Sequence, residues 1–189
     1  MDAVLVITDG GPAALVAALM ADDPASVHMW IGRDVSPDDA QVIERQARAI
    51  GAPPPQRESG DPTQRGPSAR LLAAMHAARA CGAGRVIWPI HHGADLDALL
   101  GTVERATLVT HLARLDVESA DAATGVDDAP APRVETPFAD LTTRQIAELV
   151  VDLDAPLDDC RVSPEMADEI REIRRGWFQT TAATAAEVA

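Results

Sequence analysis

The sequence predicts an α/β domain of three layers, in which a mainly parallel sheet is flanked by helices and followed by a C-terminal helix. Two observations support this prediction. Short aliphatic runs alternate with longer segments that carry helix start signals, an order typical of parallel strands joined by covering helices. The first run, residues 3–8, is apolar at almost every position, as expected of a strand buried on both faces.

The strands are predicted from short apolar runs that end at glycine, proline or polar residues. They occupy residues 3–8, 27–31, 85–90 and 133–137. The helices are predicted from apolar periodicity and from residues that begin or end a helix. They occupy residues 13–20, 36–50, 68–81, 95–115, 142–151 and 164–178, and Gly101 is where any break in the fourth would fall.

Individual residues justify the helix boundaries. Pro12 stands at the first helical position, where its missing N–H costs nothing. Ser36 and Thr142 are N-cap residues, and Gly51 ends the second helix. In the helix over 164–178, acidic residues come early and arginines late, which complements the helix dipole.

The chain divides into an α/β domain over residues 1–160 and a C-terminal helix with its tail over 161–189. Two polar segments, 53–68 and 118–133, are expected to be mobile loops because they are rich in proline or acidic residues and lack periodicity. The tail from 180 to 189 is expected to be frayed.

Composition excludes several classes of function. The chain has 189 residues, and its 16 basic residues, all arginine, face 30 acidic ones, giving a net charge of −14. A surface this acidic repels nucleic acid and anionic lipid. We therefore expect neither of them as a partner. No apolar run reaches the length of a membrane helix, no signal peptide is recognised, and two cysteines form no disulfide framework; the expected location is the cytoplasm.

The first candidate site is the turn that follows the first strand, formed by Thr8, Asp9, Gly10 and Gly11. Ligands of parallel sheets bind beyond the carboxyl ends of the strands, where a glycine-rich turn exposes N–H groups to an anion. The carboxylate of Asp9 disfavours phosphate there by like-charge repulsion. A binding loop and a purely structural turn are equally compatible with these residues.

A second candidate site follows the strand over 85–90. His91 and His92 stand next to Asp95, and His111 could complete a set of metal ligands. Solvent-exposed or helix-capping roles for these residues are favoured over metal binding.

Other polar groups have simpler interpretations. Cys81 is expected to be a small core residue, and Cys160 stands alone. Four acidic residues could attract a divalent cation, although a solvated acidic turn is the favoured interpretation. They are Asp152, Asp154, Asp158 and Asp159.

Residues 134–149 have the sequence VETPFADLTTRQIAEL. This segment resembles the late segment of the 7-cyano-7-deazaguanine synthases, in which Thr-Pro is followed, after two or three residues, by Leu-Thr-Lys-x-Glu-Ile. The resemblance extends less specifically over most of residues 3–160. It implies a Rossmann-type fold of the PP-loop ATP pyrophosphatase group, within the adenine-nucleotide α-hydrolase-like class. It also implies a link to queuosine biosynthesis, where these enzymes adenylate a carboxylate with ATP, release pyrophosphate and use ammonia to make a nitrile.

The chain departs from this family where the reaction is performed. The PP-loop signature Ser-Gly-Gly-x-Asp-Ser is replaced by Asp-Gly-Gly-Pro-Ala-Ala over residues 9–14. Thr143 stands where the family has a lysine, with Arg144 next to it. The cysteine zinc site has no counterpart, so zinc is not expected. ATP with Mg²⁺ remains a conceivable ligand, and the residues that would hold a nucleotide are Thr8, Asp9, Gly10, Gly11, Arg33, Arg65, Asp95 and Arg144.

Three hypotheses follow. The favoured one is a non-catalytic or catalytically altered relative that keeps the fold as a small-molecule or nucleotide-binding or partner-docking module. The alternative is an active ATP-dependent ligase or amidating enzyme that uses a variant loop. The third is a structural subunit that forms a homodimer or binds a protein partner through residues 165–178. Ile170, Ile173 and Trp177 share one face of that helix, although packing on its own domain is the simpler interpretation.

Overall fold

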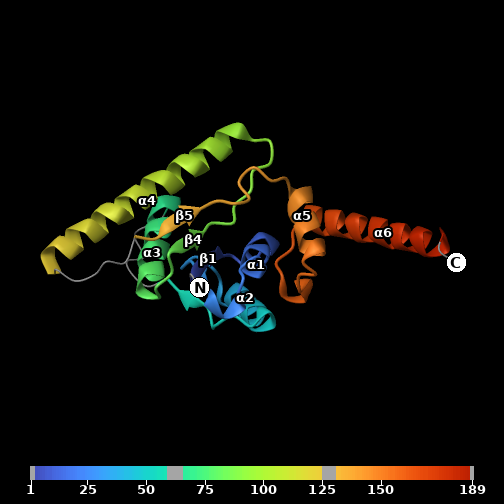
Figure 1. Ribbon diagram of the computed structural model, residues 1–189, viewed down its shortest axis with the longest axis horizontal. Helices are drawn as coiled ribbons and strands as arrows, with labels where there is room; N and C mark the ends of the chain where they lie inside the picture. The colour runs from blue at the N-terminus through green and yellow to red at the C-terminus, as the bar shows by residue number, and fades with distance from the viewer. Residues whose placement is uncertain (1–2, 59–65, 125–130, 188–189) are drawn as a thin grey trace.

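The computed structural model describes residues 3–58, 66–124 and 131–187 and has the predicted architecture, a parallel sheet between helical layers with a C-terminal helix (Figure 1). Five strands pair in the order β3-β2-β1-β4-β5, and every pairing is parallel. The strands are β1 (Val4–Thr8), β2 (Val27–Ile31), β3 (Gln56–Arg57), β4 (Arg85–Ile87) and β5 (Arg133–Glu135). The central strand, β1, is buried along its whole length.

Helices cover both faces of this sheet. They are α1 (Pro12–Leu19), α2 (Pro37–Ile50), α3 (Pro67–Ala80), α4 (Leu96–Thr124), α5 (Thr143–Asp152) and α6 (Pro164–Glu187). One core joins the sheet to α1, α2, α5 and α6, and a second joins it to α3 and α4. Val4 and Val6 of β1 belong to the first core, and Leu5 and Ile7 belong to the second. Because successive side chains of a strand point to opposite faces, both faces of β1 have to be apolar.

The predicted caps set the helix boundaries. The Ser36 hydroxyl accepts a hydrogen bond from the Asp39 N–H at 3.1 Å, and Gly51 ends α2 with φ +76°. Thr142 begins α5 with a reciprocal capping box: its hydroxyl accepts the Gln145 N–H, and the Gln145 side chain accepts the Thr142 N–H. This pairing satisfies two N–H groups that the helix itself cannot satisfy.

Both segments predicted to be loops contain regular structure. The segment 53–68 contains β3 and the start of α3, and residues 59–65 lie outside the described part. The two residues of β3 are polar, so only pairing with β2 defines them as a strand. The segment 118–133 is helical as far as Thr124 because its first part is rich in alanine and free of glycine and proline.

The course of α4 and the ends of α6 and β4 also differ from the prediction. Helix α4 passes through Gly101 without a break, and α6 continues to Glu187 through the alanine-rich stretch that we expected to be a frayed tail. Strand β4 ends at Ile87 rather than Ile90, since Pro89 has no N–H to contribute to a ladder. No described helix combines the length and apolar character needed to cross a bilayer.

The α5 cap provides a test of this assignment. The substitution Thr142→Ala removes the hydroxyl from the capping box, and we expect it to lower the free energy of unfolding by about 1 kcal/mol. The control is Thr107→Ala in the middle of α4, where the exposed hydroxyl donates only to the Val103 carbonyl of its own helix. Chemical denaturation of both variants should show a loss for the first alone. Equal effects would contradict a capping role for Thr142.

Candidate functional site

The strand order defines where the sheet opens. Adjacent strands β1 and β4 are followed by α1 and α4, which cover opposite faces of the sheet. In doubly wound sheets, ligands bind in the crevice that forms where neighbouring connections diverge in this way. Both candidate sites from the sequence, the turn after β1 and the histidine loop after β4, lie at this divergence.

The turn after β1 is closed by its own side chains. The Gly10 N–H donates to the Thr8 hydroxyl at 3.0 Å, and the Gly11 N–H donates to Oδ1 of Asp9 at 2.9 Å. Gly10 has φ +87°, a conformation that favours glycine. A Cβ added at Gly11 would meet the Asp9 carboxylate at 3.0 Å. The two N–H groups that would have to hold an anion are therefore already occupied.

The carbonyl of Gly10 ties this turn to the rest of the chain. It accepts hydrogen bonds from Nε2 of Gln46 in α2 and from the backbone N–H of Arg161 before α6, both at 2.9 Å. Gln46 is fully buried, and its Nε2 also donates to the Asp159 carbonyl, whereas its Oε1 has no partner among the described residues. The role of Gln46 was not predictable, because it stands in an ordinary amphipathic helix.

His91 of the histidine loop interacts electrostatically with Asp9 of the turn. His91 is half-buried, and burial of its ring, followed by the charge of His92, lowers its pKa below the ordinary 6.5. The negative charges of Glu165 and Asp9 act in the opposite direction and raise this pKa. The imidazole of His91 is therefore neutral at neutral pH.

His92 has a structural partner. Its Nε2 lies 2.7 Å from the hydroxyl of Thr102, a buried residue of α4, and its backbone N–H donates to the Ala139 carbonyl. Asp95 caps α4 by accepting the Ala98 N–H at 3.0 Å. Asp95 thus has the helix-capping role favoured from the sequence, whereas His91 and His92 are half-buried and not solvent-exposed as expected.

A depression of about 350 Å³ opens where the histidine loop meets the first turns of α5 and α6. We call it the His91 cleft, and its lining residues are His91, His92, Gly93, Thr142, Thr143, Arg144, Glu165 and Glu169. Thr8, Asp9, Gly10 and Gly11 do not belong to this lining, so the turn and the cleft are neighbours rather than one cavity. Glu165 and Glu169 have no distinctive sequence signal, because early acidic residues on a helix are common.

Arg144 lies in the cleft but is held by carboxylates. Its guanidinium contacts Glu169 at 3.1 Å, Glu148 at 3.4 Å and Glu172 at 3.5 Å. The charges of Glu169 and Glu172 raise its pKa further. Arg144 thus links α5 to α6, and any anion in the cleft would have to compete with three carboxylates.

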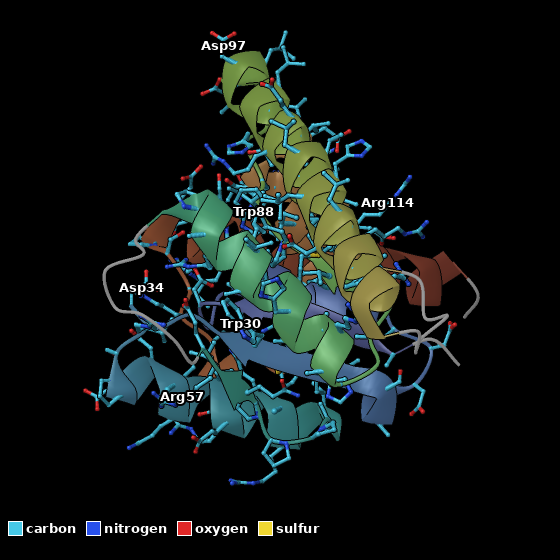
Figure 2. All side chains as sticks on the ribbon, turned by 90° about the vertical axis from the view of Figure 1, so that its left-hand side faces the viewer. Trp30, Asp34, Arg57, Trp88, Asp97 and Arg114 are labelled. Atoms are coloured by element: carbon cyan, nitrogen blue, oxygen red, sulfur yellow. The ribbon has the colours of Figure 1, made fainter. Side chains whose placement is uncertain are left out.

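Of the other two arginines proposed for a nucleotide, Arg33 has a carboxylate partner of its own. Arg33 follows β2 and binds Glu58 twice, through its backbone N–H at 3.0 Å and through its guanidinium at 3.6 Å. Its Nη1 is buried without a partner among the described residues. Nearby, Asp34, which is labelled in Figure 2, pairs with Arg70 of α3. Arg65 lies outside the described residues.

The two cysteines and Asp159 have partners within the chain. Cys160 is half-buried beside Gln46, and its burial raises the pKa of the thiol to about 11. Cys81 donates to the Ala78 carbonyl at the end of α3. Asp159 is paired with Arg45. Within the described residues, no three His, Cys, Asp or Glu side chains are grouped so that they could hold a metal ion.

The proposed docking stripe on α6 is mostly used inside the chain. Ile170 and Ile173 are buried in the core that α6 shares with α5, whereas Trp177 is 54% exposed. The two isoleucines are therefore not available to a partner, as the simpler interpretation of this helix required.

The electrostatic description of His91 gives a prediction. Because Glu165 raises the pKa of His91, the substitution Glu165→Gln should move that pKa further down from its already lowered value. The control is Asp168→Asn, which removes an exposed carboxylate that is paired with Arg171 on the same helix. An NMR titration of the imidazole measures all three proteins. A wild-type pKa above 6.5, or an upward shift in the Glu165 variant, would contradict the arrangement.

No family model matches the chain, and no curated protein matches its sequence. Its function therefore has to be inferred from the geometry of the turn and the cleft.

Proposed function

We propose that this chain is a PP-loop-like domain, related to the 7-cyano-7-deazaguanine synthases, that has lost ATP chemistry and binds a small polar ligand in the His91 cleft. The observation that carries the proposal is the closed turn, in which Thr8 and Asp9 occupy the N–H groups of Gly10 and Gly11. In an active PP-loop these donors would have to be available to phosphate.

Opening the turn for a phosphate is unfavourable for three reasons. Two internal hydrogen bonds would have to break, each contributing about 1 kcal/mol. The Asp9 carboxylate would also have to leave or face the phosphate, and repulsion between like charges opposes that approach. Rotation of Gly10 is restricted as well, because its carbonyl holds Gln46 and Arg161.

The cleft also lacks a cation that is available to pyrophosphate. Thr143 stands where the resemblance implies a lysine, and the neighbouring Arg144 is already paired with three glutamates. A threonine hydroxyl neutralises no phosphate charge. The alternative of an active ATP-dependent ligase would require Arg144 to abandon these pairs.

The chemistry of the cleft instead favours a ligand that donates hydrogen bonds. Glu165 and Glu169 supply carboxylate acceptors, and the neutral imidazole of His91 has one acceptor nitrogen. A neutral or cationic molecule with several N–H groups complements this lining, whereas a polyphosphate does not. A deazaguanine-type base, which the resemblance implies, has donors of this kind.

Calorimetric titration with Mg·ATP tests the loss of ATP chemistry. We expect no binding tighter than a Kd of about 1 mM and no release of pyrophosphate. Micromolar binding accompanied by pyrophosphate release would contradict the proposal and support the ligase alternative.

Two glycine variants test whether any ATP binding that is observed takes place at the turn. Gly11→Ala places a methyl group against Asp9 inside the turn, whereas Gly101→Ala places one in open space on α4. ATP binding at the turn would be weakened by the first variant alone. Equal binding by both variants would place the nucleotide away from the turn, which remains compatible with a closed turn.

A further inference from the structure

Three glutamates of α6 form a row on the side of this helix that faces α5. Glu165, Glu169 and Glu172 are spaced at i, i+4 and i+7, so they lie on one side of the helix. Arg144 of α5 contacts the second and the third of them, at 3.1 Å and 3.5 Å. The two helices pack against each other (Figure 1). The row is therefore the wall of α6 to which α5 attaches.

The first glutamate of this row has no such cation. Among the described residues, none forms a hydrogen bond or an ion pair with the Glu165 carboxylate. Glu165 lines the His91 cleft together with Glu169 and Arg144. One arginine and two glutamates leave the charged part of this lining with an excess of one negative charge. A ligand with a single positive charge would therefore compensate Glu165 as Arg144 compensates the rest of the row.

The histidine loop supplies a neutral acceptor on another wall of the cleft. Burial of the His91 ring and the charge of His92 lower the pKa of His91, so the ring is neutral at neutral pH and keeps one acceptor nitrogen. No described residue donates a hydrogen bond to this ring. The acceptors of His91 and Glu165 thus come from different elements of the fold and line the same cleft. A ligand that satisfies both needs N–H donors on more than one edge.

We propose that the His91 cleft binds a small molecule with a singly charged, planar amidinium or guanidinium group. The inference rests on the proposed function and narrows its small polar ligand to this class of cation. One edge of the group donates to the Glu165 carboxylate in the paired geometry that suits a planar fork. Another edge donates to the acceptor nitrogen of His91. The cleft volume of about 350 Å³ lies within the range of sites for small ligands.

Other classes of ligand fit this lining less well. An ammonium group is compact and strongly hydrated, and it has no fixed planar edges. An anion would meet two glutamates and would have to take Arg144 from Glu169. A neutral molecule of the same planar shape can form the hydrogen bonds, but it leaves the excess negative charge uncompensated. The guanidinium of Arg144 already shows the favoured arrangement, because it binds carboxylates of α5 and α6 at once.

A titration of the full chain with three small probes tests this selectivity. The probes are methylguanidinium, its neutral isostere methylurea, and methylammonium. The amide resonances of Gly93 and Thr143, which line the cleft, report binding in an NMR experiment. We expect saturable shifts with methylguanidinium at concentrations on the order of millimolar. The affinities of the other two probes should be at least about threefold weaker, because charge-assisted hydrogen bonds in planar pairs are the strongest that the lining can form.

Two variants with the same change of charge test the role of Glu165. Glu165→Gln should weaken methylguanidinium binding at least about threefold and leave methylurea binding unchanged. The control is Glu44→Gln, at an exposed residue of α2 that does not line the cleft, and it should change neither affinity. A buffer of about 0.15 M salt screens long-range effects of the charge change. Both side chains are exposed, so circular dichroism should show intact folding.

The outcomes separate the class of ligand from the existence of the site. Equal affinity for methylurea or methylammonium, or an unchanged affinity in Glu165→Gln, would overturn the planar cation and still leave the cleft a ligand site, as the proposed function requires. No shift with any probe would overturn the inference, whereas the loss of ATP chemistry is decided separately by the titration with Mg·ATP. If the peptide Gly-Arg-Gly bound more than about tenfold tighter than methylguanidinium, the ligand would be an arginine of a partner protein and not a small molecule.

Discussion

The hydrogen bonds of the Thr8–Gly11 turn connect the central strand to α2 and to the segment that precedes α6. The side chains of Thr8 and Asp9 satisfy the glycine N–H groups, and the Gly10 carbonyl holds Gln46 of α2 and the backbone of Arg161. Because the turn is built this way, α1 begins directly after β1, and the segment that leads into α6 is fixed beside it. The same bonds remove the donors that a phosphate would need. The hydrogen bonds that build the turn are therefore also the basis of the proposed loss of ATP chemistry.

Other charged side chains proposed for a nucleotide also have partners within the chain. Arg33 is paired with Glu58, Arg144 with glutamates of α5 and α6, and Asp95 with the start of α4. Each of these side chains has a partner within the fold, so a nucleotide would have to compete with that partner. The His91 cleft, in contrast, is an open depression whose lining includes the carboxylates of Glu165 and Glu169 from α6.

Much of the fold was predictable because its signals are local. The apolar run of β1, the Ser36 cap and the Gly51 stop depend on neighbouring residues and appear where expected. What the sequence did not predict depends on contacts between distant segments: the pairing of the polar strand β3, the burial of Gln46, and the glutamates of α6 that reach the histidine loop. The turn after β1 and the histidine loop after β4 follow adjacent strands, but the partners of their residues were not predictable from spacing.

Amide chemical shifts of Gly10 and Gly11 during a titration with pyrophosphate test the closed turn most directly, because they report on the two donors themselves. If Thr8 and Asp9 hold these groups, both resonances stay in place up to millimolar pyrophosphate, on the order of the weakest specific affinities. Saturable shifts of both amides would mean that the turn opens to accept phosphate, and would contradict the account.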